Sequence, residues 1–278
     1  MDDGLSTSST NPVVSRLHGQ VLVLTLDRPT VRNAINLEMV TELSHQLNLA
    51  ESNPAVRCVI LTGNNGAFCS GGDLGSMGKN SNNHALPDPV TTLRSVEELR
   101  KTQRATALRL HQFPKPTLAA LPGAAVGAGF SWALACDLRV MSDTAFLATG
   151  FSNMALSGDH GGLFFLTRLV GSAKALELYL LSPRVTAPEA LALGLTNWVC
   201  SASDLPTTAL NIARQLATGA PMAQRFIKQN LALAQVAHDA GTYMDEEAHR
   251  QVATLQTDDF REAIQAFKQQ RSPNFTGR

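Results

Sequence analysis

Short apolar runs alternate with helix-like segments over the first two thirds of the chain. Runs rich in valine, leucine and isoleucine, bounded by glycine or polar residues, predict strands at 13–17, 21–26, 57–62, 118–121, 138–141 and 198–200. Apolar residues at helical spacing predict helices that begin after Asn36 and at Phe130, and further helices at 91–112, 162–170, 172–181 and 188–193. A repeating order of strands and helices indicates the α/β class.

The last quarter of the chain has a different pattern. Helical periodicity continues through 205–218, 221–235, 246–256 and 259–270 with no further strand. We therefore expect a flexible tail at 1–11, an α/β core at 12–204 and a helical region at 205–278.

The segment 118–137 combines an apolar strand, a tight turn and the start of a helix. The turn is built from small residues, among them Gly123, Gly127 and Gly129. The first N–H groups of a helix have no partner inside it, and the helix dipole adds partial positive charge there. Bare glycine backbone lets another molecule approach closely, so the turn is suited to an anion or to an oxygen that becomes one.

The segment 57–74 has the same character. A buried strand is followed by a turn and by Gly71-Gly72, which precede another short helical segment. Two such turns, each behind an apolar strand, could each donate one N–H to a single oxygen. That arrangement is an oxyanion hole in outline.

Composition and charge describe an ordinary globular protein. Hydrophobic residues make up 44% of the 278, and 23 Lys and Arg balance 23 Asp and Glu, so no long basic face for nucleic acid is implied. Four widely spaced cysteines form no CxxC pair, which favours reduced thiols over a metal site. No window is long and apolar enough to cross a bilayer, and the polar, acidic start MDDGLSTSST is unlike a targeting peptide. We expect a cytoplasmic protein without a membrane partner.

Several motifs resemble those of one family. FCSGGDL (68–74) and PKPTLAALPGAAVGAGFSWALACDLRV (114–140) resemble the two signature segments of the crotonase superfamily, the enoyl-CoA hydratase/isomerase family. LDRP (26–29) with NAI (33–35), LTRLVG (166–171) and ALALGL (190–195) resemble its other segments, in the family's order. The resemblance implies a core of stacked ββα turns and C-terminal helices that form a homotrimer or a dimer of trimers. It also implies an acyl-CoA thioester as substrate, with no cofactor beyond the coenzyme A of that substrate.

The resemblance assigns the two oxyanion N–H groups to Gly72 and Ala128. Their role would be to hold the thioester carbonyl oxygen and to stabilise the enolate formed from it. A hydratase of this family carries one glutamate at the position of Ser131 and another at the position of Phe151. Neither residue here can act as a carboxylate base, so two-glutamate hydration is in question.

One carboxylate lies nearby in the sequence. Asp159 aligns with the nucleophilic aspartate of 4-chlorobenzoyl-CoA dehalogenases of the same superfamily, and it could be a general acid/base or a nucleophile. The alternative is that Asp159 caps the following helix. Its neighbour His160 could relay a proton, or point elsewhere. For Asp137 we expect an ion pair with Arg139 or a backbone cap rather than catalysis.

The resemblance also implies contacts with coenzyme A. Arg28 and Arg32 are placed to meet phosphates, and the backbone at Val31 and near Ala67 and Cys69 would contact the adenine and pantetheine arm. Two cations of the last helix, Lys268 and Arg271, are candidates to meet the phosphates bound by a neighbouring subunit.

The acyl end of the substrate would lie near Gly71, Phe130, Ser131 and Phe151. The polar segment 77–89 is either a lid over the substrate or an inert surface loop. The nominal reaction is hydration of a 2-enoyl-CoA or its reverse. Alternatives are double-bond isomerisation, hydrolysis or C–C cleavage of an acyl-CoA, and acyl-CoA binding without catalysis.

Overall fold

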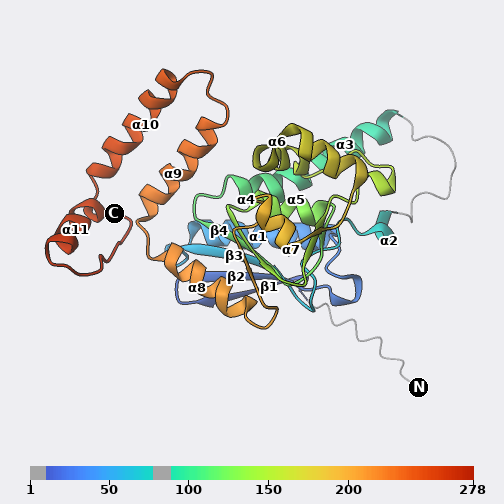
Figure 1. The fold of residues 1–278 in the computed structure, drawn as a ribbon, viewed down its shortest axis with the longest axis horizontal. Helices are drawn as coiled ribbons and strands as arrows, with labels where there is room; N and C mark the ends of the chain where they lie inside the picture. Colours follow the sequence, from blue (N-terminus) through green and yellow to red (C-terminus); the bar gives the residue numbers. More distant parts are fainter. Residues whose placement is uncertain (1–10, 78–88) are drawn as a thin grey trace.

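A computed structural model describes residues 11–77 and 89–278. Figure 1 shows an α/β core of sheets and covering helices, from which the C-terminal helices project to one side. The strands are β1 (Val13–His18), β2 (Val21–Leu26), β3 (Cys58–Gly63), β4 (Thr117–Leu121), β5 (Ala125–Val126), β6 (Leu138–Ser142), β7 (Phe146–Ala148), β8 (Val185–Thr186) and β9 (Trp198–Cys200).

The larger sheet of the described chain has the strand order β1-β2-β3-β4-β6-β9. Strands β1 and β2 form an antiparallel hairpin, and each later neighbour is parallel, as helical crossovers require. Alternate residues of the central strands face two different apolar clusters. Ile60 and Leu118 pack against α8 (Leu205–Ala217), whereas Leu61 and Leu121 face the main core. Burial on both faces explains why these strands read as continuous apolar runs.

A second, small sheet has the order β5-β7-β8 and was not predicted. Its strands have two or three residues each, too short for an alternating pattern to be recognised. It matters for function because β5 lies inside the 118–137 segment, immediately before the turn at Gly127.

The helices largely follow the prediction. The one expected at 91–112 is present as α3, a π-helical segment and α4, and α6 contains Gly171 in a non-helical conformation, where two helices were expected. The helices are α1 (Leu37–Ser52), α2 (Leu74–Met77), α3 (Pro89–Gln103), α4 (Arg109–His111), α5 (Ala128–Ala135), α6 (Gly162–Leu181), α7 (Ala187–Ala192), α8 (Leu205–Ala217), α9 (Pro221–Ala234), α10 (Ala240–Leu255) and α11 (Asp258–Lys268). Shorter helical segments are η1 (Pro29–Val31), η3 (Arg104–Leu108, the π-helical one) and η4 (Ser152–Met154).

The helices α9, α10 and α11 form what we call the arm, which projects beyond the orange helix α8 in Figure 1 and runs from orange to red. One lysine fastens it to the core: Lys228 of α9 donates to the Phe113 carbonyl (2.5 Å), to the Lys115 carbonyl (3.1 Å) and to Oδ2 of Asp137 (2.6 Å). A second bond joins the end of the chain to the core, from Arg57 to the Phe275 carbonyl (3.1 Å), and α9 itself contains no buried residue. The position of the arm therefore depends on a small number of polar contacts.

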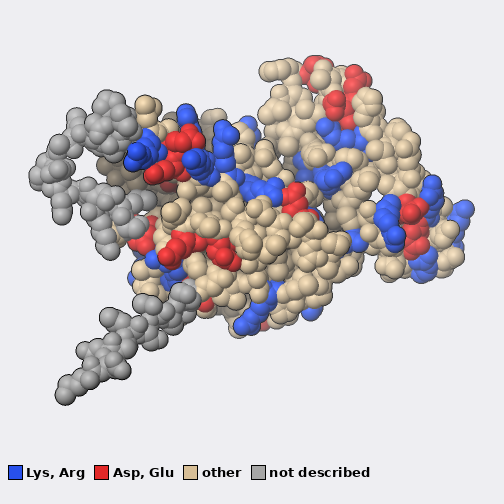
Figure 2. All heavy atoms as spheres, turned by 180° about the vertical axis from the view of Figure 1, so that it is seen from behind, with Lys and Arg blue, Asp and Glu red and all other residues tan. Residues whose placement is uncertain are grey.

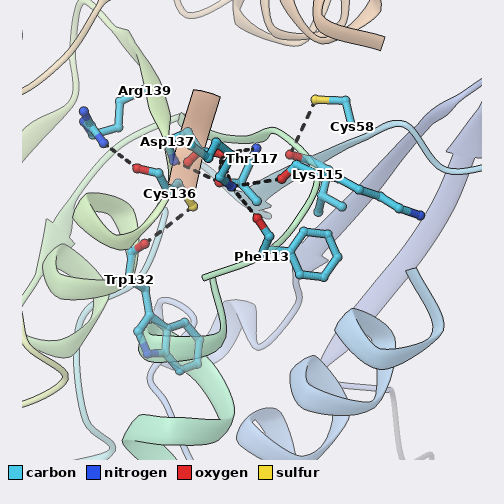
Figure 3. A network of polar contacts seen from close by, with 10 residues as sticks. Cys58, Phe113, Lys115, Thr117, Trp132, Cys136, Asp137 and Arg139 are labelled. Carbon is cyan, nitrogen blue, oxygen red and sulfur yellow. Dashed lines mark hydrogen bonds and ion pairs between the residues drawn. The ribbon is translucent and has the colours of Figure 1, made fainter. Parts of the chain in front are cut away.

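Of the two partners expected for Asp137, the backbone is found and Arg139 is not. Oδ2 of Asp137 accepts hydrogen bonds from the backbone nitrogen and hydroxyl of Thr117, in addition to Lys228. Arg139 instead donates to the carbonyls of Cys136 and Leu195, and Figure 3 shows it directed to Cys136. Asp137 lies in the bend before β6, against Thr117 of the neighbouring strand β4, whereas Arg139 lies inside β6.

Charges are interspersed on the surface. On the face drawn in Figure 2, basic and acidic groups lie beside one another, and neither sign forms a continuous band. In the described residues, no helix combines the length and the apolar character needed to span a bilayer. The segment 77–89, for which we considered a lid, lies almost entirely outside the described residues.

Candidate active site

The two glycine-rich turns predicted from the sequence lie against each other. A Cβ atom built on Gly71 would be 3.1 Å from the Val126 carbonyl oxygen and 3.7 Å from the Ala128 nitrogen. Between them, Cys69 pairs with Ala125 as an isolated parallel bridge. Segments almost sixty residues apart in the sequence thus form one surface.

The N–H of Gly72 faces this surface. Gly72 forms a parallel bridge with Ile35, in which Ile35 donates to the Gly71 carbonyl (2.8 Å) and accepts from the Asp73 nitrogen (2.9 Å). In this parallel pair, the backbone groups of the residues before and after Gly72 bond to Ile35. The N–H of Gly72 itself therefore points away from Ile35, to the opposite edge of the segment. That edge is the one occupied by 126–128.

The N–H of Ala128 is the first of helix α5. It has no acceptor inside the helix, and the helix dipole is positive there. The preceding Gly127 has φ 57° and ψ −125°, a conformation that other residues avoid, and Gly71 has φ 98°. These two glycines allow the turns to approach, while the convergence of the Gly72 and Ala128 N–H groups on one oxygen stays a prediction.

Asn33 holds the first turn in place, and sequence reasoning did not single it out. It is fully buried with φ 59°, and its amide nitrogen donates to the carbonyls of Asn64 (3.0 Å), Ala67 (2.9 Å) and Phe68 (3.3 Å). The Oδ1 of Asn33 accepts a hydrogen bond from the backbone nitrogen of Arg28 (2.9 Å). An asparagine beside the LDRP segment, in a position that needs a left-handed backbone, is the signal that could have identified it.

The residues predicted to contact coenzyme A surround this turn. The guanidinium of Arg28 is engaged with Asp73 (2.9 Å) and the Ala34 carbonyl, so a phosphate would have to compete with that ion pair. The exposed Val31 and Arg32 accept hydrogen bonds from Ser70 through their carbonyls.

Ala67 and Cys69 are buried. The Ala67 carbonyl accepts from Asn33, while both backbone groups of Cys69 bond to the 124–126 segment. Burial raises the pKa of the Cys69 thiol to about 12, so the thiol stays protonated. Coenzyme A contacts at these positions stay a prediction.

Helix α5 carries two further residues predicted at the site, Phe130 and Ser131. Phe130 is fully packed in the core, at 1% exposure. Ser131, one turn after Ala128, lies within hydrogen-bonding distance of the carbonyls of Gly127 (3.3 Å) and Asp159 (3.1 Å). Phe151 lies on the other side of the turn, with its ring 3.9 Å from a Cβ built on Gly127. Thus Ser131 and Phe151, at which the resemblance places the hydratase glutamates, both lie beside Gly127.

Asp159 is not a helix cap. The N-cap of α6 is Gly161, without a side-chain cap, and the buried Oδ1 of Asp159 has no hydrogen-bond partner in the described chain. Burial raises the pKa of this carboxyl to about 6. A buried carboxyl whose pKa is raised to about 6, on a residue whose backbone carbonyl accepts from the Ser131 hydroxyl (3.1 Å), is suited to proton transfer.

Tyr179 of α6 also belongs to this group, although the sequence analysis did not select it. Its ring stacks on Phe151, with centroids 5.8 Å apart, and burial together with the nearby Asp159 carboxylate raises the pKa of its phenol. A tyrosine amid the apolar residues of a helix gives no signal in the sequence, because only the fold places it beside the 158–162 turn.

His160 does not serve as the proton relay that we considered. It is 5% exposed, and its Nδ1 accepts a hydrogen bond from the indole nitrogen of Trp132 (3.2 Å). The nearby Thr106 hydroxyl donates to the Thr102 carbonyl, so Trp132 is the donor to His160. Burial lowers the pKa of the imidazole to about 4, which keeps it neutral. His160 is therefore a structural residue.

Of the two cations predicted on the last helix, Lys268 is exposed and Arg271 lies just beyond α11, paired with Glu262 (2.5 and 2.9 Å). Among the described residues, no group of three His, Cys, Asp or Glu side chains is arranged to hold a metal ion.

Comparison with known proteins identifies the family and agrees with the fold. The sequence model described as enoyl-CoA hydratase/isomerase matches residues 16–278. The chain is 34% identical to 1,2-epoxyphenylacetyl-CoA isomerase of Escherichia coli (96% of this chain, 98% of the relative). It is also 34% identical to 2,3-dehydroadipyl-CoA hydratase of the same organism, over the same shares.

Solved structures give the same result. An enoyl-CoA hydratase from Polaromonas sp. JS666 superimposes with a TM-score of 0.86 at 36% identity, covering 95% of this chain and 99% of the other. This chain belongs to the enoyl-CoA hydratase/isomerase family of the crotonase superfamily.

Proposed function

We propose that this enzyme isomerises the double bond of an enoyl-CoA. In this mechanism, the N–H groups of Gly72 and Ala128 hold the thioester oxygen, and Asp159 moves the proton. The observation that carries the proposal is the Asp159 carboxyl, whose buried Oδ1 has no hydrogen-bond partner among the described residues and whose backbone carbonyl accepts from Ser131. One base can remove a proton from one carbon and return it to another, whereas hydration must both activate water and protonate carbon.

The steps balance without any added reagent. The carboxylate of Asp159 removes a proton from the carbon between the thioester and the double bond, and the electrons move into the thioester carbonyl to give a dienolate. The oxyanion carries the charge while it is bound by the two N–H groups. Asp159 then returns the proton to the far end of the dienolate, which leaves the double bond conjugated with the thioester.

Hydration of a 2-enoyl-CoA, or its reverse, is the second candidate. It is supported by the similarity to 2,3-dehydroadipyl-CoA hydratase. Here Asp159 alone would have to serve both the water and the carbon, because a serine and a phenylalanine occupy the two glutamate positions.

The test compares the parent with Asp159→Asn on two thioesters. With 3-hexenoyl-CoA, isomerisation creates the conjugated enoyl thioester and its absorbance appears, whereas with crotonyl-CoA, hydration removes it. We expect isomerisation, lowered about 10²–10⁴-fold by the substitution, which removes a general base. The matched control is Asp245→Asn on the exposed face of α10.

Activity should rise with pH through about 6, because the base must be ionised and burial raises the pKa of Asp159 to about 6. Loss of crotonyl-CoA without conversion of 3-hexenoyl-CoA would show that the enzyme is a hydratase and not an isomerase. Binding of both thioesters with no turnover would show a non-catalytic binding protein. Release of free coenzyme A would show a hydrolase.

We also propose that the arm assembles three copies of the chain. Its described helices expose large apolar side chains, including Ile227 (65%), Leu231 (63%), Met244 (62%) and Phe267 (86%). Exposed apolar area on a projecting helical element is typical of an interface. Sedimentation should give three or six times the mass of one chain, and a monomer at micromolar concentration would contradict the proposal.

A further inference from the structure

Two buried polar atoms at the candidate site, one on Asp159 and one on Tyr179, have no hydrogen-bond partner. In the part of the chain that the structure describes, the buried and unpaired side-chain nitrogen and oxygen atoms are Arg57 Nη1, Asp159 Oδ1 and Tyr179 Oη. The last two both line one cavity of about 170 Å³, beside the 157–162 turn and the first turns of α6. Because an unpaired buried polar atom costs free energy, two at one cavity point to a bound group that completes them.

The Tyr179 side chain is fixed from several sides. The residue is 7% exposed, its ring stacks on Phe151 with planes 19° apart, and Gly158 lies under its edge. A Cβ built on Gly162 would collide with both Ser131 Oγ and Tyr179 Oη, so the two oxygens flank that glycine. Ser131 has a single proton, which is directed to the Gly127 or the Asp159 carbonyl. The Tyr179 hydroxyl makes no hydrogen bond of acceptable geometry to Ser131 or to another described group, so its proton is available to a bound acceptor.

Two side chains connect the cavity with the glycine-rich turn at 126–128. Phe151 lies between Gly127 and Tyr179, and the Ser131 hydroxyl lies within hydrogen-bonding distance of the Gly127 and Asp159 carbonyls. A thioester whose oxygen is held at Gly72 and Ala128 would extend its acyl chain toward this pair. The cavity of about 170 Å³ has room for a small substituent of that chain.

We propose that Tyr179 and Asp159 together bind a hydroxyl group on the acyl chain of the substrate. The phenol donates to the hydroxyl oxygen, and the hydroxyl donates to Oδ1 of Asp159, so all three polar groups are satisfied. A pure hydrocarbon chain would leave both protein atoms unpaired. This inference rests on the proposed function, since it takes an acyl-CoA as the ligand, and it assigns Tyr179 as a specificity-determining residue.

The test measures the affinity for three saturated thioesters by calorimetry: butyryl-CoA, 3-hydroxybutyryl-CoA and 4-hydroxybutyryl-CoA. We expect the parent to bind one hydroxy thioester about 10-fold more tightly than butyryl-CoA, as expected for a hydrogen-bonded hydroxyl. Tyr179→Phe should remove that preference and leave butyryl-CoA affinity unchanged. The matched control is Tyr243→Phe on α10, where the phenol bonds to Glu247 (2.8 Å).

Thermal unfolding separates this role from a structural one. Tyr179→Phe removes a hydroxyl without a partner, so the melting temperature should stay equal or rise. A lower melting temperature, or a parent that binds the three thioesters equally, would overturn the inference and show that water alone occupies the cavity.

Failure of the proposed function is visible separately. Exchange of the α-proton of butyryl-CoA with deuterated water reports the enolate and needs no hydroxyl. If the exchange occurs and depends on Asp159 while no hydroxyl preference is found, only the further inference fails. If no exchange occurs, the enolate chemistry fails.

Discussion

The indole nitrogen of Trp132 donates a hydrogen bond to Nδ1 of His160 over 3.2 Å. The bond fixes the proton of the neutral imidazole on Nε2, and it connects the middle of α5 with the turn that carries Asp159. Since His160 has φ 49°, the contact also holds a backbone conformation that most residues avoid. We interpret this pair as the support that positions Asp159.

His160 should make the fold sensitive to acid. The pKa of His160 is about 4 in the folded state and 6.5 as a model value, so the unfolded chain binds the proton first. The stability that this residue contributes is present above about pH 6.5 and is lost as pH falls toward 4, by up to about 3 kcal/mol. Asp159 has the opposite effect between pH 4 and 6, because its folded pKa is raised.

Comparison of the parent with His160→Asn isolates this effect, since Asp159 is common to both. Asparagine tolerates the left-handed backbone and can accept from Trp132. Denaturant unfolding should show that the parent loses more stability than the variant between pH 7 and 4. Parallel curves would contradict a buried neutral histidine.

Ala128→Pro should disable the oxyanion site while keeping the helix. Proline is tolerated at the first helical position, and it lacks the N–H that would hold the thioester oxygen. We expect the turnover number for 3-hexenoyl-CoA to fall about 10²–10³-fold, as for loss of one oxyanion donor. Ala240→Pro, at the first position of α10, is the matched control. Full activity of Ala128→Pro would show that its N–H has no catalytic role.

Lys228→Met should loosen the arm. The substitution removes three hydrogen bonds to the core and leaves the partly buried Asp137 with Thr117 alone. We expect a loss of about 1–3 kcal/mol in unfolding free energy, measured at a fixed protein concentration because assembly adds to stability. Lys174→Met, which breaks an exposed pair with Glu177, should change it by less than about 0.5 kcal/mol. Equal losses in the two variants would argue against an anchor.

Asn33→Gly should destabilise the first turn without backbone strain. Glycine tolerates the φ of 59°, so the loss reports the side-chain hydrogen bonds to Asn64, Ala67 and Phe68. We expect a loss of about 2–4 kcal/mol, since three carbonyls lose a buried donor. Because the turn also carries Gly72, hydrogen exchange of 67–73 should accelerate. Unchanged hydrogen exchange at 67–73 would show that the Asn33 side chain is not needed to hold the turn.

The sequence determined the elements whose signals are local. The central strands are buried on both faces, so their apolar runs were visible, and the small residues around Gly71 and Gly127 marked both turns. Each turn is one continuous stretch of sequence, so its motif could be recognised and the family identified from it. Asp159 could be selected for the same reason.

Only the tertiary structure decided which side chains meet at the site. It paired Trp132 with His160 and so removed the histidine from the chemistry, and it bound Asp137 to Lys228 from a helix ninety residues away. It also placed Tyr179 beside Asp159. These contacts join segments distant in the chain, and the free energy of each depends on burial and partners, which residue order alone does not encode.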